Sequence, residues 1–191
     1  MKVLPLVTLG ALALAGCVPD FASDGNSPLI LLMTGVNGGN VLTSDLRLGG
    51  AICADFVSLR LENKPKNPNL AGLDWRGDIV VTRYQVSYFR SDGRGAQGVD
   101  VPYTISGNMA AEVIFNEATS VTIEVVRRQA KLEPPLTGVV DGNPPVLTMF
   151  AQITVQGQTN AGAAVSATGR LQIDFADFAD SGTPTCPTST Q

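Results

Sequence analysis

The chain has 191 residues, of which 13 are lysine or arginine, 17 are aspartate or glutamate and none is histidine. Its formal charge of -4 argues against nucleic acid as a partner, because neutralising phosphates needs a basic surface. Without histidine the chain lacks the usual general base near neutral pH and the commonest zinc ligand, so most hydrolase and zinc-enzyme classes are excluded.

The first residues predict export. Lys2 precedes an uncharged apolar stretch over 3–15, which is shorter than the roughly 20 residues that a transmembrane helix needs. The stretch ends in Leu-Ala-Gly-Cys at 14–17, which resembles the lipobox of bacterial lipoproteins. The resemblance implies that residues 1–16 are a lipoprotein signal peptide. The alternative is an ordinary secretory signal followed by an unmodified cysteine.

In the lipobox interpretation, Cys17 becomes the acylated N-terminus of the mature protein. Two or three acyl chains on one cysteine hold a protein permanently on a membrane without a spanning segment. Val18 follows the cysteine, and a residue other than aspartate there implies sorting to the outer membrane in a Gram-negative host. Glycine, proline, asparagine and serine are frequent within 17–27, so we expect this segment to be a linker.

Residues 28–179 are expected to form one all-β domain. Apolar and polar residues alternate there with period two, as in strands with one buried face. The alternation covers 57–61, 80–88, 109–115, 121–125, 147–155 and 165–175, with weaker candidates at 28–34 and 101–106. Turn residues that predict chain reversals lie at 37–40, 91–93, 107–108, 141–145 and 160–162. Seven or eight such strands predict an antiparallel, two-sheet, immunoglobulin-like β-sandwich, with a small β-barrel as the alternative.

The cysteines predict one disulfide. With Cys17 acylated, Cys53 and Cys186 are the remaining pair, and an exported protein folds where thiols can be oxidised. The bond would tie the Ser/Thr/Pro-rich tail, 180–191, back to the domain. The alternative is a buried free thiol at Cys53 and a free Cys186 in the tail. The single Trp75 precedes a strand in a loop-like stretch, unlike the core tryptophan of true immunoglobulin domains.

Aspartates near the end of the domain raise a calcium hypothesis. Asp174, Asp177 and Asp180 follow one another at intervals of three, which is not the spacing of an EF-hand. In an extended strand positions 174 and 177 point to opposite faces, so only a turn would gather them, together with Asp100 or Asp92. We favour solvated aspartates and no cofactor. The same carboxylates are the candidates for a histidine-free, carboxylate-type hydrolase.

Lysine offers a second histidine-free chemistry, a Ser-Lys dyad. After removal of the signal peptide the remaining lysines are Lys64, Lys66 and Lys131. The first two lie in the turn-rich stretch 63–68, where an exposed loop gives no cause for a lowered pKa. Lys131 belongs with Arg127 and Arg128 to the densest basic cluster, which we interpret as a solvated strand end.

A glycine-rich loop over 92–98 is the candidate recognition loop, with Asp92 and Arg94 as its charged residues and Trp75 as a further candidate contact. It lacks the Gly-Lys-Ser/Thr ending of a phosphate-binding loop. The segments 88–94 and 98–102, with the acidic-aromatic end of the domain, resemble a group of bacterial lipoproteins without an assigned activity. That resemblance implies a β-sandwich lipoprotein and no particular reaction.

We therefore expect a lipid-anchored, non-catalytic protein of the bacterial cell envelope that acts as a structural or protein-interaction module. Its lipid would hold it on the membrane, and its partner would be an envelope protein or a cell-surface polymer. The first alternative is a β-sandwich that binds carbohydrate or calcium. The second is the histidine-free carboxylate-type hydrolase.

Overall fold

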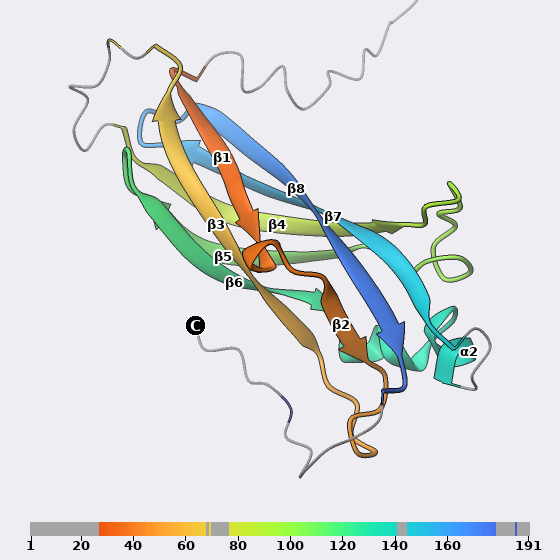
Figure 1. The fold of residues 1–191 in the computed structure, drawn as a ribbon. Coiled ribbons are helices and arrows are strands. Elements are labelled where there is room, and N and C mark those ends of the chain that lie inside the picture. The colour runs from red at the N-terminus through yellow and green to blue at the C-terminus, as the bar shows by residue number, and fades with distance from the viewer. Residues whose placement is uncertain (1–26, 68, 70–76, 141–144, 179–185, 187–191) are drawn as a thin grey trace, which may run out of the picture.

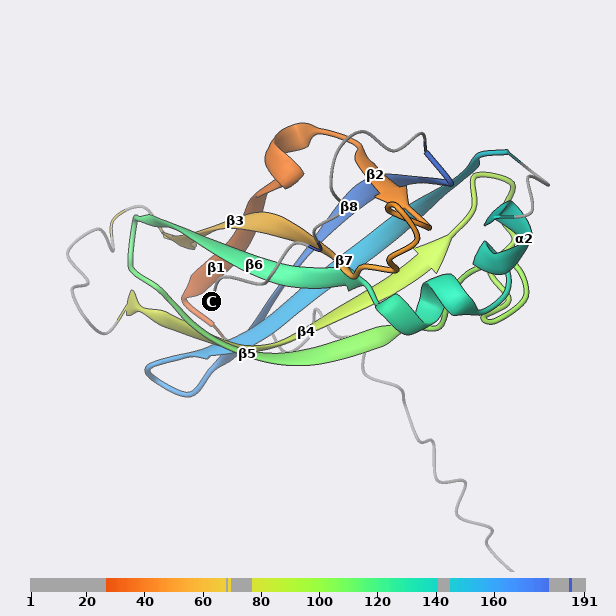
Figure 2. The ribbon, with the colours of Figure 1, turned by 90° about the horizontal axis from the view of Figure 1, so that it is seen from below.

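The computed structural model describes residues 27–67, 69, 77–140, 145–178 and 186. Its eight strands form two sheets that pack face to face (Figures 1 and 2), which confirms the predicted β-sandwich. The three-stranded sheet has the order β1 (Leu29–Val36), β3 (Asp55–Pro65) and β6 (Ala118–Val126). The five-stranded sheet has the order β2 (Leu42–Asp45), β8 (Ala164–Ala176), β7 (Leu147–Thr159), β4 (Ile79–Phe89) and β5 (Ile105–Val113).

This strand order is that of an immunoglobulin-like domain. Strands β1, β3 and β6 take the places of A, B and E, and β8, β7, β4 and β5 take those of G, F, C and C′. Strand β2 is parallel to β8, whereas all the other strand pairs are antiparallel. The parallel pair arises because the chain changes sheets at the 3₁₀ turn η1 (Asn37–Gly39) and continues in the same direction (Figure 1), so the predicted reversal at 37–40 is wrong.

The core lies between the sheets. Strands β7 and β8 each alternate buried and outward residues along 13 residues, with Met149, Ile153, Ile173 and Phe175 fully buried. The predicted facing of 147–155 and 165–175 is confirmed.

In β4 the alternation places Val80 on the same face as Tyr84, Val86 and Tyr88, and this prediction is wrong at Val80. A β-bulge between Val81 and Arg83 shifts the alternation by one residue. Val81 is therefore buried and Val80 is only half-buried.

A turn was also predicted at 107–108, but β5 runs straight through these residues. Gly107 is needed there for close packing, because the ring of Tyr84 lies where a Cβ atom would be. A glycine signals a close approach as well as a turn, and the sequence pattern does not distinguish the two. Of the weaker strand candidate at 101–106, only 105–106 belong to β5, because that strand begins at Ile105.

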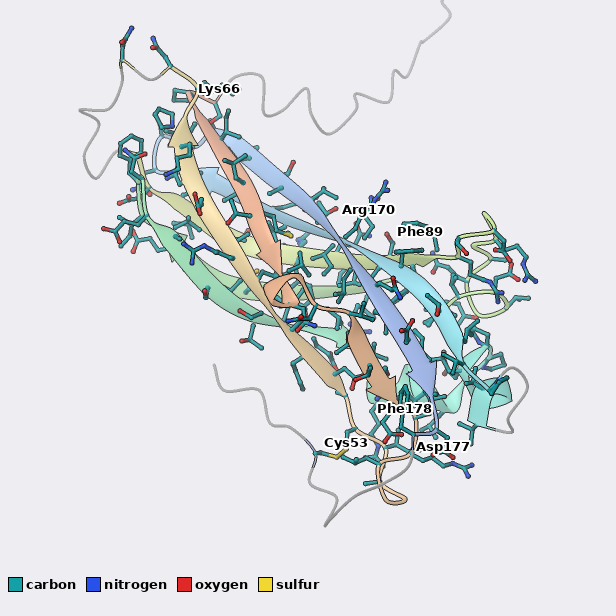
Figure 3. The ribbon with its side chains drawn as sticks, viewed as in Figure 1. Cys53, Lys66, Phe89, Arg170, Asp177 and Phe178 are labelled. Carbon is teal, nitrogen blue, oxygen red and sulfur yellow. A yellow bond between two sulfur atoms is a disulfide. The ribbon has the colours of Figure 1, made fainter. Side chains whose placement is uncertain are left out.

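The sheets are also joined by side-chain hydrogen bonds, one of which crosses the core. The Tyr88 hydroxyl of β4 donates a hydrogen bond across the core to the Val125 carbonyl of β6, and burial raises the pKa of that hydroxyl. The predicted disulfide is confirmed: Cys53, just before β3, is bonded to Cys186, and their Cα atoms are 5.2 Å apart (Figure 3). This bond fastens residue 186 to the chain ahead of β3 and is not the inter-sheet disulfide of antibody domains.

Candidate functional site

A groove of about 760 Å³ lies between β5 and β6. Apolar side chains of both strands lie in it, and polar residues form its rims. It is lined by Phe56, Tyr84, Asn108, Met109, Ala110, Ala111, Ser120, Val121, Thr122, Ile123 and Glu124. We call it the β5–β6 groove.

The groove follows from the topology. Among the described residues, β5 pairs with β4 alone and β6 with β3 alone, so each strand has one edge without a neighbouring strand, and both of these edges are on the same side of the sandwich. On the opposite side β1 packs against β8, and Met33 occupies the space above Gly169. An edge strand presents backbone N–H and C=O groups that can pair with another strand. The sandwich is thus closed on its β1–β8 side and open on its β5–β6 side.

Hydrogen bonds hold the two edges at a fixed separation at both ends of the groove. Near the β5–β6 turn the Thr119 hydroxyl donates to the Glu112 carbonyl at 3.1 Å. At the other end the Arg127 guanidinium donates to the Ser106 carbonyl, also at 3.1 Å. A hydrogen bond between β5 and β6 therefore bounds the groove at each end.

The floor of the groove carries Tyr84, which packs on Gly107 and hydrogen-bonds to the backbone of Glu124. Burial raises the pKa of the Tyr84 hydroxyl, and the Glu124 carboxylate adds to the rise. Met109 and Val121 lie half-buried on either side. The floor is thus apolar and uncharged at neutral pH, with a single carboxylate, Glu124, among the lining residues.

The alternation of apolar and polar residues predicts that Met109, Ala111 and Val121 belong to the core. They do face inward, but all three stay half-buried because no strand of the other sheet covers them at the open side. Their alternation is the same as that of fully buried residues elsewhere in the domain. No local signal distinguishes an inward residue at an open edge from one in a closed core.

A buried ion pair lies at one end of the sandwich, and it corrects the prediction for the basic cluster. Lys131 is in the 3₁₀ helix η4 (Arg128–Leu132), which is followed by the short helix α2 (Leu136–Val140), and its side chain is only 1 % exposed. Its Nζ lies 2.9 Å from the Asp55 carboxylate and donates to the Asp45 carbonyl at 2.7 Å. The Ser44 hydroxyl donates to the same carboxylate at 2.6 Å. Only the arginines of the predicted solvated cluster are exposed.

This ion-pair cluster does not form a Ser-Lys nucleophile. The Ser44 hydroxyl donates to Asp55 and is fully buried, so it is closed to a substrate. Burial raises the pKa of Asp55, while the charge of Lys131 opposes the rise. The lysine at position 64 is not in a loop as predicted: β3 continues to Pro65, and Lys64 lies 3.8 Å from Glu62 in an ion pair.

The glycine-rich loop is exposed, as predicted, and its charges are paired internally. Arg94 contacts the Asp92 carboxylate at 2.8 Å and lies 3.9 Å from Asp100. The hydrogen bond from the Arg94 side chain lowers the pKa of Asp92. Asp100 also accepts a hydrogen bond from the Ala96 N–H at 3.2 Å. The loop is a small salt-bridged structure, and Trp75, the other candidate contact, lies outside the described residues.

The proposed calcium ligands are not gathered in the described part of the chain. Asp174 accepts hydrogen bonds from Thr148 and Gln172, and Asp177 is exposed. Within the residues that the structure describes, no three acidic or cysteine side chains form a group that could hold a metal ion. Asp180 and the lipidation candidate Cys17 both lie outside those residues.

No protein-family model matches the chain, and no curated protein matches it significantly. Over the described residues, no helix has the length and apolar character needed to cross a membrane. The inference about function therefore rests on the sequence and on the geometry of the sandwich.

Proposed function

We propose that the protein is a lipid-anchored, non-catalytic interaction module of the bacterial cell envelope, and that its β5–β6 groove receives an extended segment of another envelope protein. The observation that carries the proposal is the pair of free strand edges on one side of the sandwich, with an apolar groove between them. The membrane attachment rests on the lipobox resemblance at 14–17.

An extended segment fits this site for two reasons. First, between Ser106 and Glu112, whose carbonyls already accept hydrogen bonds from Arg127 and Thr119, the edge of β5 offers backbone donors and acceptors that a strand of a partner can satisfy by adding to the sheet. Second, alternate side chains of an added strand point to one face, so every second residue would enter the groove beside Met109 and Val121. Backbone pairing would supply affinity, and apolar side chains in the groove would supply specificity.

The groove favours a partner strand with apolar residues at alternate positions. Its lining is uncharged except for Glu124, whose carboxylate lies 3.9 Å from Arg127 in an ion pair. Burying a partner carboxylate beside Glu124 would weaken binding, because the carboxylate would lose its hydration and be repelled by a like charge. We therefore expect acidic side chains to be absent from the inward positions of the bound segment.

Photo-crosslinking in cells tests the groove. A photoreactive residue at Asn108, on the exposed rim of β5, is expected to give a discrete crosslinked species with an envelope protein. The same residue at Leu32, exposed on β1 two strands away from β6, serves as the matched control. Adding Met109→Glu is expected to abolish the Asn108 crosslink, because it buries a charge in the apolar groove. Equal crosslinking from both positions, or none from Asn108, would contradict the proposal.

The anchor has a separate test. Full-length protein purified from native membranes is expected to lack residues 1–16 and to exceed the mass of residues 17–191 by a glyceryl group and its acyl chains. A Cys17→Ala variant is expected to carry no lipid and to leave the membrane fraction, because the acyl chains supply the attachment. An unmodified cysteine on a membrane-bound protein would contradict the anchoring mechanism and leave the groove untouched.

A further inference from the structure

The outer face of the five-stranded sheet is polar but carries few charges along β4, β7 and β8. Across β4, β7 and β8 it presents amide and hydroxyl side chains in register. The paired rows include Ser87, Gln152 and Arg170, then Gln85, Thr154 and Thr168, then Arg83, Gln156 and Ser166. No lysine or glutamate interrupts these rows, which we call the amide face.

The outer face of the three-stranded sheet is the internal comparison. There Arg60, Glu62 and Lys64 of β3 form two ion pairs, at 3.5 Å and 3.8 Å. Mixed charges of this kind are typical of a face that only meets solvent. On the amide face neither Arg83 nor Arg170 has an ion-pair partner among the described residues. Two unneutralised arginines thus lie on a face of a chain whose formal charge is -4.

Aromatic rings adjoin this face. Phe89 of β4 stacks on its cross-strand neighbour Phe150 of β7, with ring centroids 5.5 Å apart. The Arg170 guanidinium lies over the Phe89 ring, 5.4 Å from its centroid, as Figure 3 places the two side chains. Both rings are half-buried and keep part of their surface open to solvent. An apolar platform therefore lies next to a positively charged donor group.

The other end of the amide face is hollowed. Gly157 of β7 is confined to glycine because a Cβ atom there would meet the Val80 carbonyl. Beside it lies a hollow of about 380 Å³. Polar side chains surround this hollow, among them Thr82, Gln156 and Gln158. The face thus combines a long polar strip with a shallow recess. From Phe150 to Gln158 it extends about 27 Å along β7, at the usual rise of a strand per residue.

We propose that the amide face binds an acidic polysaccharide, meaning a sugar chain that carries carboxylates. Glutamine amides both donate and accept hydrogen bonds, which suits the hydroxyl groups of sugars. Arginine recognises a carboxylate through two parallel hydrogen bonds, and neither Arg83 nor Arg170 has an ion-pair partner among the described residues. The apolar side of a sugar ring can cover the open part of the Phe89 and Phe150 platform. This site is on a different surface from the β5–β6 groove and does not depend on the groove having a partner.

Binding of full-length, detergent-solubilised protein to polygalacturonate tests the inference, with neutral dextran as the second polymer. Wild-type protein is expected to bind polygalacturonate, more weakly as salt is added, and not dextran. The double variant Arg83→Gln/Arg170→Gln is expected to lose at least tenfold in affinity at an unchanged melting temperature. Arg60→Gln removes one exposed arginine from the opposite outer face and is expected to keep wild-type affinity.

Four results would overturn the inference. The first two are absence of polygalacturonate binding by the wild type and equal binding of dextran. The other two are wild-type affinity in the double variant and an equal loss of affinity in Arg60→Gln. The variant Gln152→Glu gives an independent check. The added carboxylate lies on the amide face beside Arg170, and it is expected to weaken polygalacturonate binding by repulsion while leaving the β5–β6 crosslink at Asn108 intact.

Discussion

Replacing Cys53 and Cys186 by alanine together is expected to lower the free energy of unfolding by about 4 to 5 kcal/mol. The bond joins residues 133 positions apart, so in the unfolded chain it closes the segment that holds β3 to β8 into one loop. Loss of that constraint raises the entropy of the unfolded state, and the cost grows with the length of the loop. Chemical denaturation of the wild-type and double-alanine proteins measures the difference directly.

The control for this prediction separates the crosslink from packing. Cys53 is buried, so its sulfur also fills space next to the core. Reducing the wild-type protein under native conditions leaves both side chains in place and removes only the bond. We expect reduced wild type and the double-alanine variant to lose similar stability. A loss below about 1 kcal/mol in both would contradict the chain-entropy account.

Changing Lys131 to methionine is expected to lower the free energy of unfolding at neutral pH by about 3 to 5 kcal/mol. The methionine keeps much of the volume but leaves the Asp55 carboxylate, whose side chain is 14 % exposed, without its opposite charge. A buried charge that loses its partner is strongly destabilising. The double variant Lys131→Met/Asp55→Leu removes both charges and is expected to recover most of the loss.

The pH dependence of the same variant gives a second readout. Burial raises the pKa of Asp55 in the folded protein, and the charge of Lys131 opposes this rise. Without the lysine the folded pKa lies further above its unfolded value, so the contribution of Asp55 to stability is complete at low pH and is lost as the pH rises through the folded pKa. The deficit of Lys131→Met is thus expected to shrink from pH 7 to pH 5. A deficit that is constant or larger at pH 5 would contradict this account.

The sequence pattern predicted the strands with one fully buried face. In β7 and β8 every second residue meets the opposite sheet, so alternation alone predicts both the strand and its facing. It did not predict β2, which has only four residues and pairs in parallel with a distant strand. It also missed the bulge at Val81, because a bulge changes the phase of the alternation without changing its period.

The candidate sites were harder to predict than the strands, for a physical reason. The β5–β6 groove is created by two strands that do not pair, and such an absence of pairing is a property of the whole topology. Burial of Lys131 likewise depends on Asp55, Ser44 and Asp45, which lie far away in the sequence. In the sequence, Arg127, Arg128 and Lys131 have the same charge and similar neighbours. Only tertiary contacts determine that Lys131 is buried and the two arginines are exposed. The disulfide was predictable because the number of cysteines restricts the choices.

The position of β1 has a mechanical consequence. Its first residue, Leu29, lies beside Lys66 at one end of the sandwich, whereas Cys53 and Asp177 lie at the other end (Figure 3). Under the proposed lipid anchor, a pull between the membrane and that far end would run along the axis of β1. The hydrogen bonds to β3 are perpendicular to this axis and would bear the force together, in shear, instead of opening one after another. The domain would then resist a pull along β1 better than a pull that peels β1 away from β3.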